Sequence, residues 1–336
     1  KTVIKNIKEY IIVKNKSKNK FSLKNAFSTR KAMQSVPPPD IVHELTNDEL
    51  AQLQECFLEM IKDIDRVCEK YGICYMAAGG TALGAVRHKG FIPWDDDVDL
   101  LMPHDDLKKF IEVFDSELGD GYEMTSPNSQ YYLESMITAI YKKNTLKASL
   151  NSYNTPFPKG IHIDIFPIER VPMNPVVRFF KGYSAMALQY IAVSALFYHY
   201  RNKEKKEFFY QSFAGKINYN IRCLVGFLTS FRSYEKWGNA FNNYVQWHKD
   251  SNLWAVPTDM GHYFGHIMPK SVYYPPRKAE FEDFLINVPN DTDSYLKNQY
   301  GDYMKIPDEK DREKHYSVGF SVDVEKDIAN GKDIYL

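Results

Sequence analysis

The first strongly patterned segment of this chain has apolar residues at helical spacing. Thr46 is followed three residues later by Glu49, a pair that commonly caps the start of a helix. Gly72 provides a stop signal. The apolar positions between them are Leu50, Leu53, Phe57, Met60, Ile61, Ile64 and Val67. This spacing predicts one long amphipathic helix.

The pattern then changes to short segments that alternate in type. Polar and apolar residues alternate after Asp97, as expected for a strand with one buried face. We expect strands at residues 73–78, 97–102, 136–142 and 161–168, a helical turn at 81–86 and a helix at 105–118. This order predicts an α+β fold with a small mixed sheet flanked by helices.

Shifts in composition suggest four segments. Residues 1–42 are rich in Lys and Asn and are expected to form a peripheral or mobile arm. Residues 43–175 are expected to form the α+β core, and residues 176–255 a helical lobe. Residues 256–336 are rich in loops and are expected to complete the domain formed by residues 43–175.

Composition narrows the class of protein. Lys plus Arg equals Asp plus Glu, 43 each, so no global field favours nucleic acid. The four cysteines lack metal-ligand spacing, and no secretion signal is recognisable, which favours a cytoplasmic protein. The apolar stretch at 179–200 contains Lys181, Gln189 and His199 and is interpreted as a buried or interfacial helix.

The most informative stretch is residues 79–99. It combines four glycines and basic residues with four carboxylates at positions 95–99. Glycine backbone and basic groups suit a phosphate, and clustered carboxylates suit a hard divalent cation. Residues that could bind a phosphate are Gly79, Gly80, Thr81, Arg87, His88 and Lys89. Each also has an ordinary interpretation, as a turn, a cap or a solvated loop residue.

The carboxylates point to a particular arrangement. Asp97 and Asp99 would face the same way on one strand and could share Mg²⁺ or hold two ions. His162, Asp164 and Phe166 would share one face of the strand at 161–168. An unpaired carboxylate within that strand is costly to bury, so we expect Asp164 to join the other two around a cation. The alternative for Asp97 and Asp99 is a solvated edge strand that carries acidic residues. The alternative for Asp164 is a carboxylate that pairs with a neighbouring Lys or a backbone amide.

Residues 80–99 closely resemble the signature of the LicD family, which includes bacterial phosphorylcholine transferases and relatives of the fukutin-type ribitol-phosphate transferases. Further resemblance lies in the motifs Ile163-Asp164-Ile165-Phe166-Pro167, Phe281-Glu282 and Tyr300-Gly301-Asp302-Tyr303-Met304, with Pro307 and His315. The resemblance implies a nucleotidyltransferase-like core that binds Mg²⁺ through Asp97, Asp99 and Asp164, with Mn²⁺ as a substitute. A His-His pair of many members appears here as His315-Tyr316.

The function that this resemblance implies is transfer of phosphocholine, or a similar phospho-alcohol, from CDP-choline or another CDP-alcohol. The acceptor would be a hydroxyl of a glycan, a lipid-linked glycan or a teichoic acid precursor, and no nucleic acid partner is expected. The Lys and aromatic content of the helical lobe is compatible with peripheral contact to a membrane surface, and the alternative is an ordinary helical packing domain. Candidate choline contacts are Tyr75, Trp94, Trp254, Tyr273 and Tyr274, each of which could instead be a packing residue. Candidate supporting residues are Asp95, Asp96, His162 and His315.

Three other functions remain open at this point. A DxD-type glycosyltransferase would release a nucleoside diphosphate, and a nucleotidyltransferase would release pyrophosphate. A non-catalytic metal- or glycan-binding protein would show no turnover.

Overall fold

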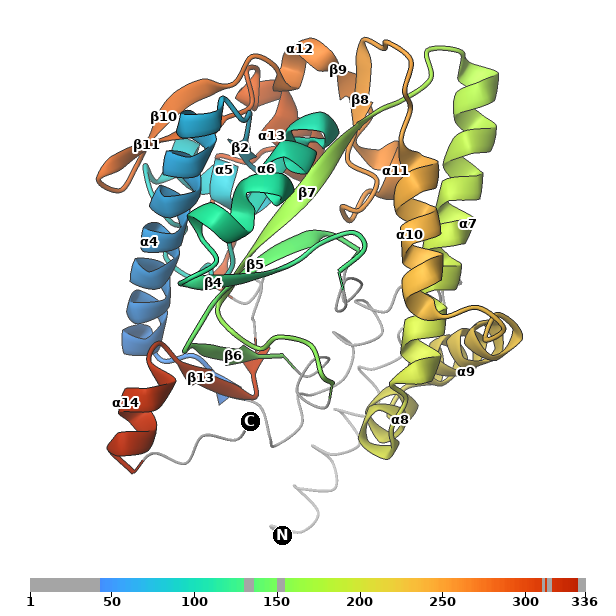
Figure 1. Cartoon of the computed structure of the whole chain (residues 1–336), viewed down its shortest axis with the longest axis horizontal. Coiled ribbons are helices and arrows are strands. Elements are labelled where there is room, and N and C mark those ends of the chain that lie inside the picture. Colours follow the sequence, from blue (N-terminus) through green and yellow to red (C-terminus); the bar gives the residue numbers. More distant parts are fainter. Residues whose placement is uncertain (1–42, 130–135, 150–154, 310–311, 313–315, 332–336) are drawn as a thin grey trace, which may run out of the picture.

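A computed structural model describes residues 43–129, 136–149, 155–309, 312 and 316–331 (Figure 1). The predicted arm at 1–42 and His315 lie outside the described residues. The chain forms a curled mixed sheet with helices packed around it, which confirms the predicted fold class.

The central sheet has the strand order β2-β3-β7-β5-β4. Its strands are β2 (Met76–Ala77), β3 (Asp99–Pro103), β7 (His162–Arg170), β5 (Thr138–Lys142) and β4 (Tyr122–Thr125). Strands β3 and β7 run parallel, and the other neighbours on this path are antiparallel. Strand β8 (Leu253–Ala255) extends the sheet beside β7, and β9 (Met268–Pro269) pairs with β8.

Three helices pack close to this sheet. Helix α4 (Asn47–Tyr71) begins at the predicted capping box, in which Thr46 and Glu49 bond each other's backbone, and ends at Gly72. Helix α5 (Gly79–Arg87) is longer than the predicted turn, and α6 (His104–Glu117) follows β3 directly. Together they cover a core that includes Phe57, Leu100 and Ile165.

The strand after the acidic run is shorter than its alternating pattern predicts. Strand β3 begins at Asp99, so Asp97 lies in the connection before it and the prediction of one strand holding both is wrong. Contacts from distant residues hold this connection, because the Gln54 side chain donates to the carbonyl groups of Ile92 and Asp95.

Helices predominate between β7 and β8. They are α7 (Pro175–His199), α8 (Lys203–Tyr210), α9 (Phe213–Leu228) and α10 (Tyr234–Val245). Both α9 and α10 pack against α7 (Figure 1). Their apolar contacts form cores separate from that of the central sheet. Among the described residues, no helix has the length and apolar character needed to cross a bilayer.

The C-terminal part returns to the sheet. It contains α11 (His262–Gly265), α12 (Lys270–Tyr273), β10 (Arg277–Phe281), β11 (Phe284–Val288) and α13 (Thr292–Tyr300). The β10–β11 hairpin and α13 both contact α5. Two small antiparallel pairs, β1 (His43–Glu44) with β12 (Tyr316–Ser317) and β6 (Leu146–Ala148) with β13 (Gly319–Ser321), precede α14 (Val324–Ala329).

Candidate functional site

Asp99 and Asp164 are direct neighbours in the sheet. They are paired positions of the parallel strands β3 and β7, so their side chains leave the same face. The N–H of Asp99 donates to the Thr81 hydroxyl (3.0 Å), and its carbonyl accepts from Ala78 N–H (2.9 Å). The N–H of Asp164 donates to the carbonyl of Val98 (3.1 Å). The backbone of both carboxylates is therefore fixed.

Like charge accumulates at this place. Burial, followed by repulsion from Asp97, Asp164, Asp95 and Asp259, raises the pKa of Asp99 well above its ordinary value. Burial and Asp97 raise the pKa of Asp164 to about 7, against a smaller opposing effect of Lys147. The three carboxylates predicted to act together thus interact electrostatically.

The start of α5 faces these carboxylates. A Cβ atom added to Gly79 would lie 3.4 Å from Oδ2 of Asp99, and one added to Gly80 would lie 2.7 Å from Oδ2 of Asp95. No side chain caps the start of this helix. Because Asp95 and Asp99 lie beside its first two residues, the partial positive charge of the helix N-terminus is close to carboxylates. Gly79 also has a left-handed backbone, with φ of 44°. The backbone conformation therefore favours glycine at position 79, and a side chain at position 80 would displace the carboxylate of Asp95.

The predicted phosphate-binding side chains do not all gather here. Thr81 is buried and holds the backbone of Asp99. Arg87 bonds His88 Nε2 (2.9 Å) and the carbonyl of Tyr303 (2.8 Å). Burial lowers its pKa, whereas Asp95 opposes that shift, so Arg87 lies within electrostatic range of the acidic cluster.

The neighbouring basic residues have other partners. Burial, followed by Arg87, lowers the pKa of His88, and the His88 ring meets Trp94 edge-on at 6.2 Å. Lys89 is exposed and pairs with Glu280 at 2.7 Å. The Lys89 side chain is therefore bound to the β10–β11 hairpin and does not lie in the acidic cluster.

The Phe281-Glu282 motif supports the same loop. Phe281 packs against Phe91 at 4.8 Å, and the Glu282 side chain accepts from Phe91 N–H (3.0 Å). The carbonyl of Lys89 accepts from Glu282 N–H (2.8 Å). The hairpin therefore fixes the loop that connects α5 to the acidic run.

The predicted supporting carboxylates differ in environment. Asp95 adjoins Gly80 at the start of α5. Asp96 is buried and pairs with Lys147 Nζ at 3.1 Å, and Lys147 also bonds the carbonyl of Asp96. His162 Nε2 lies 3.9 Å from Asp164 Oδ1.

The five predicted choline contacts do not form one cage. Tyr75 and Tyr273 are fully buried, and their hydroxyls donate to Asp65 and to the carbonyl of His266. Trp254 and Tyr274 lie beside each other, with ring centroids 6.4 Å apart. Trp94 instead packs under Arg312, whose guanidinium carbon is 4.0 Å from the ring centroid.

Residues from the C-terminal part join the site, among them Tyr300, the first residue of a motif named in the sequence analysis. The Tyr300 hydroxyl would lie 3.4 Å from a Cβ at Gly79, and Tyr295 accepts the Gly79 N–H (3.1 Å). Gln299 donates to Tyr295 (2.8 Å) and to Asp259 (3.4 Å). Helix α13 therefore contributes one wall of the site, which only the tertiary structure reveals.

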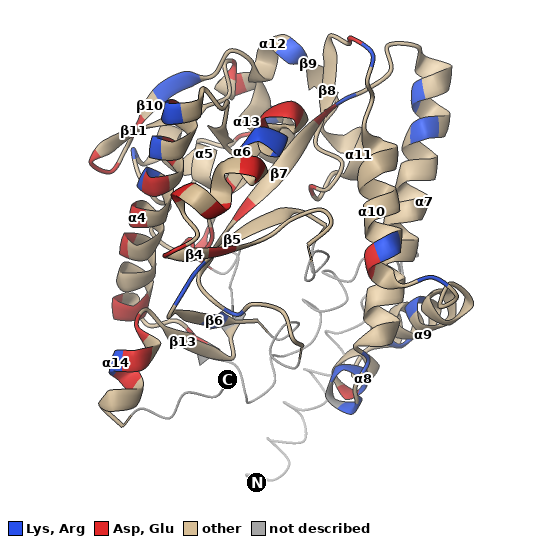
Figure 2. Cartoon of the chain, in the orientation of Figure 1, with Lys and Arg blue, Asp and Glu red and all other residues tan. Residues whose placement is uncertain are grey.

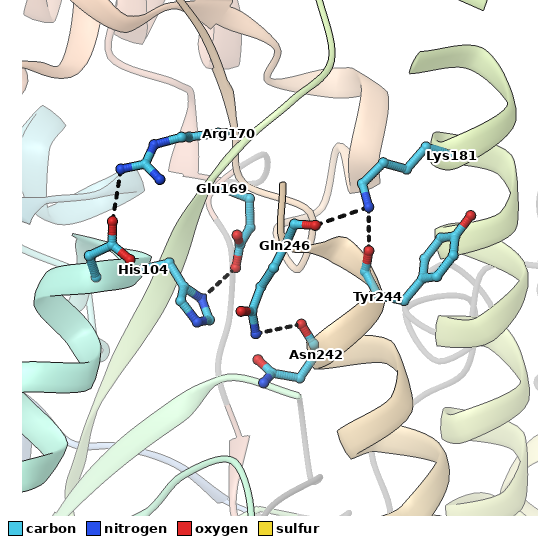
Figure 3. A network of polar contacts seen from close by, with 8 residues as sticks. His104, Glu169, Arg170, Lys181, Asn242, Tyr244 and Gln246 are labelled. Atoms are coloured by element: carbon cyan, nitrogen blue, oxygen red, sulfur yellow. Dashed lines mark hydrogen bonds and ion pairs between the residues drawn. The ribbon is translucent and has the colours of Figure 1, made fainter. Parts of the chain in front are cut away.

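A separate polar network lies at the other end of β3 and β7 (Figure 3). His104 Nδ1 is 2.6 Å from Oε1 of the buried Glu169, and Arg170 pairs with Asp105 at 2.8 Å. Lys181 donates to the carbonyl groups of Tyr244 and Gln246. These contacts line or adjoin a hollow of about 360 Å³ of empty space, part of it open to solvent. Among the predicted site residues that the structure describes, only Trp254 lines this hollow. We therefore interpret the network as a contact region between the sheet and the helical lobe.

Comparison with known proteins identifies the chain's relatives. The family model described as "LicD/FKTN/FKRP, nucleotidyltransferase domain" matches residues 72–189. The lipopolysaccharide cholinephosphotransferase LicD of Haemophilus influenzae is 27% identical over 279 residues, 80% of this chain and 96% of that protein. An uncharacterized protein of Rickettsia typhi is 38% identical over 66 residues, 20% of this chain and 21% of that protein. The matched domain contains the acidic cluster and the start of α5, and this part of the chain is similar to the nucleotidyltransferase domain of the LicD family.

Proposed function

We propose that this protein transfers phosphocholine, or a similar phospho-alcohol, from a CDP-linked donor to a hydroxyl of a cell-surface glycan or its precursor, releasing CMP. The similarity to a lipopolysaccharide cholinephosphotransferase along 96% of that relative supports the reaction class. The observation that carries the proposal is the carboxylate cluster Asp97, Asp99 and Asp164 beside the start of α5.

The donor chemistry of this cluster fits Mg²⁺ or Mn²⁺. Hard divalent cations prefer carboxylate oxygens, and the repulsion that raises the pKa of Asp99 and Asp164 would be relieved by a cation. No group of three or more ligating side chains in the described part of the chain has a geometry that could hold a metal ion as it stands. Asp99 and Asp164 nevertheless occupy paired positions about 4.8 Å apart across the ladder, so side-chain rotation can bring their carboxylates together.

When bound, the cation would neutralise charge on the donor's diphosphate. The first turn of α5 would face the donor's phosphates with its N–H groups. Arg87 interacts electrostatically with Asp95, so its guanidinium lies near the acidic cluster. Its positive charge would stabilise the departing CMP. Lys89, paired with Glu280, is left out of this proposal.

Asp164 is suited to accept the proton of the acceptor hydroxyl. Its carboxylate leaves the same face of the sheet as that of Asp99, beside the place proposed for the donor's phosphates, where it could take up a proton from the acceptor. The acceptor oxygen would bond to the phosphorus of the phospho-alcohol as the bond from that phosphorus to the CMP oxygen breaks. The hydroxyl proton would pass to Asp164, and the electron pair of the broken bond would leave with CMP.

The alcohol end of the donor requires a different wall. Tyr300 is 42% exposed, and its hydroxyl lies near Gly79 and Asp99. An exposed aromatic ring beside several carboxylates suits a quaternary ammonium group. Tyr300 therefore replaces the buried Tyr75 and Tyr273 as the candidate choline contact.

The test is to identify the nucleotide released from a panel of CDP-alcohols and nucleotide-sugars, with Mg²⁺ and a lipopolysaccharide acceptor. We expect CMP from CDP-choline, and loss of at least about 100-fold in rate in Asp97→Asn and Asp99→Asn, because charge stabilisation at the reacting phosphate is lost. Asp115→Asn on the exposed surface of α6 is the matched control. Release of a nucleoside diphosphate from a nucleotide-sugar, or no turnover of any CDP-alcohol, would contradict the proposal.

A further inference from the structure

The buried face of helix α9 lacks the aliphatic residues that usually fill the core-facing side of an amphipathic helix. The residues that it buries are Gly215, Asn218, Tyr219, Arg222 and Gly226, none of them aliphatic. A Cβ added to Gly226 would lie 2.4 Å from the carbonyl oxygen of Ser194, so this face lies directly against α7. The guanidinium of Arg222 sits 5.0 Å from the ring centroid of Tyr190.

The opposite face of α9 is apolar and exposed. Leu224 is 58% exposed, Leu228 is 62% exposed, and Phe231, just beyond the helix, is 82% exposed. We define the α9 face as these residues together with Phe213 and Phe227. Their spacing places them on one stripe, opposite to Asn218 and Arg222. The amphipathic pattern of this helix is thus inverted.

The segment around the α9 face is strongly basic. Residues 201–232 hold seven Lys or Arg, of which Arg222 is buried, and two Asp or Glu, in a chain whose formal net charge is zero. Lys203, Lys206 and Lys216 are among its exposed side chains. Figure 2 shows blue residues on α9 and both blue and red residues on α8, whereas the blue residues of α7 lie toward its end away from α9.

We propose that the α9 face docks this protein onto an anionic lipid surface. An amphipathic helix lying in the interfacial plane, with apolar residues among the headgroups and lysines beside them, binds membranes in this way. Lys and Arg near anionic lipid strengthen such binding. This inference is independent of the reaction proposed above.

Charge decides between lipid and a second copy of the chain. A symmetric dimer through the α9 face would bring two identical basic segments together, and like charges across an interface oppose association. A surface of anionic headgroups instead complements both the apolar stripe and its basic surroundings. The lipid surface is therefore the occupant that the observations favour.

The experiment is flotation of the full chain with vesicles of phosphatidylcholine plus phosphatidylglycerol and with vesicles of phosphatidylcholine alone. We expect binding to the anionic vesicles that weakens as salt is added. Leu224→Ser/Leu228→Ser should weaken this binding by about tenfold or more, because the inserted apolar area is lost. The matched control is Leu285→Ser/Ile328→Ser, two residues that are 53% and 54% exposed elsewhere on the molecule.

A second variant tests the charges. Lys203→Gln/Lys216→Gln should lower the partition coefficient by about fivefold for each lysine near the surface. Residues 1–42 are also Lys-rich, so the variants within residues 203–228 carry the test. Hydrogen exchange in α9 should slow in the presence of anionic vesicles.

The outcomes separate the occupants. Binding to anionic vesicles that both variants weaken, with the control unchanged, supports the proposal. Absence of vesicle binding, binding that neither variant alters, or a dimer in light scattering that Leu224→Ser/Leu228→Ser dissociates would overturn it.

Discussion

Replacing Asp164 by Asn should stabilise the metal-free protein at alkaline pH. Burial and Asp97 raise the pKa of Asp164 from 3.8 to about 7. The folded protein therefore holds a proton on this carboxyl between these pH values, whereas the unfolded chain has lost it. The free energy of unfolding of the wild type consequently falls as pH rises from about 4 to about 7.

The size of this effect follows from the shift in pKa. About three units correspond to about 4 kcal/mol at pH 8. The Asp164 side chain is 27% exposed, so screening by water reduces the expected penalty to about 2 kcal/mol. Asn has no proton to lose in this range, and Asp164→Asn should therefore escape the penalty.

The assay is urea unfolding of both proteins in a chelator, at pH 4.5 and pH 8. The quantity of interest is the change with pH in the difference between their free energies of unfolding, because titrating groups that do not interact with Asp164 cancel. We expect Asp164→Asn to gain about 2 kcal/mol relative to wild type between these pH values. Mg²⁺ should stabilise the wild type more than the variant at pH 8. A difference that does not change with pH, with Asp115→Asn as control, would refute the reasoning.

Three further variants test the supports of the site. Thr81→Val removes the acceptor of Asp99 N–H in a buried position, so urea unfolding should show a loss of about 1–3 kcal/mol, and an unchanged stability would count against this role. Lys147→Met leaves the buried Asp96 carboxylate without this cation and should cost about 3–5 kcal/mol, part of which Lys147→Met/Asp96→Asn should recover; failure to recover any would argue against the pair. Gly79→Ala strains a left-handed backbone by about 1–2 kcal/mol and places a methyl group near Asp99, so CDP-choline affinity measured by calorimetry should fall; unchanged affinity would remove Gly79 from the donor site.

Local patterns predicted those elements that depend on neighbouring residues in the sequence. Helix α4 follows its apolar spacing and its Thr46–Glu49 capping box because both act within a few residues. The pairing of Asp99 with Asp164 was also within reach, since two alternating strands each carried a carboxylate on one face. The start of α5 at the two glycines agrees with the predicted turn there.

Long-range contacts decided what local patterns could not. Gln54 holds the connection before β3, so Asp97 lies outside the strand that its alternation suggested. Lys89 pairs with Glu280, nearly 200 residues further along the chain. Composition does not reveal that the Lys89 side chain is directed to this partner and not to the acidic cluster. Lys147 reaches the cluster through β6 without any motif around it, and Tyr300, although part of a recognised motif, reaches it only through the packing of α13.

The exposed α9 face shows a different limit of sequence analysis. Its residues read simply as part of an apolar helical lobe, because periodicity alone does not say which face is buried. The structure places Arg222 inside and Leu224 outside. The exposed apolar residues of α9 and the exposed lysines of α8 and α9 then form one surface.

Calorimetric titration of CDP-choline into the protein, with and without Mg²⁺, tests the central claim most directly, because it needs no acceptor. The account predicts binding that requires Mg²⁺ and that is lost in Asp99→Asn while Asp115→Asn binds as wild type does. Equal affinity with and without Mg²⁺, or undiminished binding by Asp99→Asn, would contradict a metal-dependent phospho-alcohol transferase built on this carboxylate cluster.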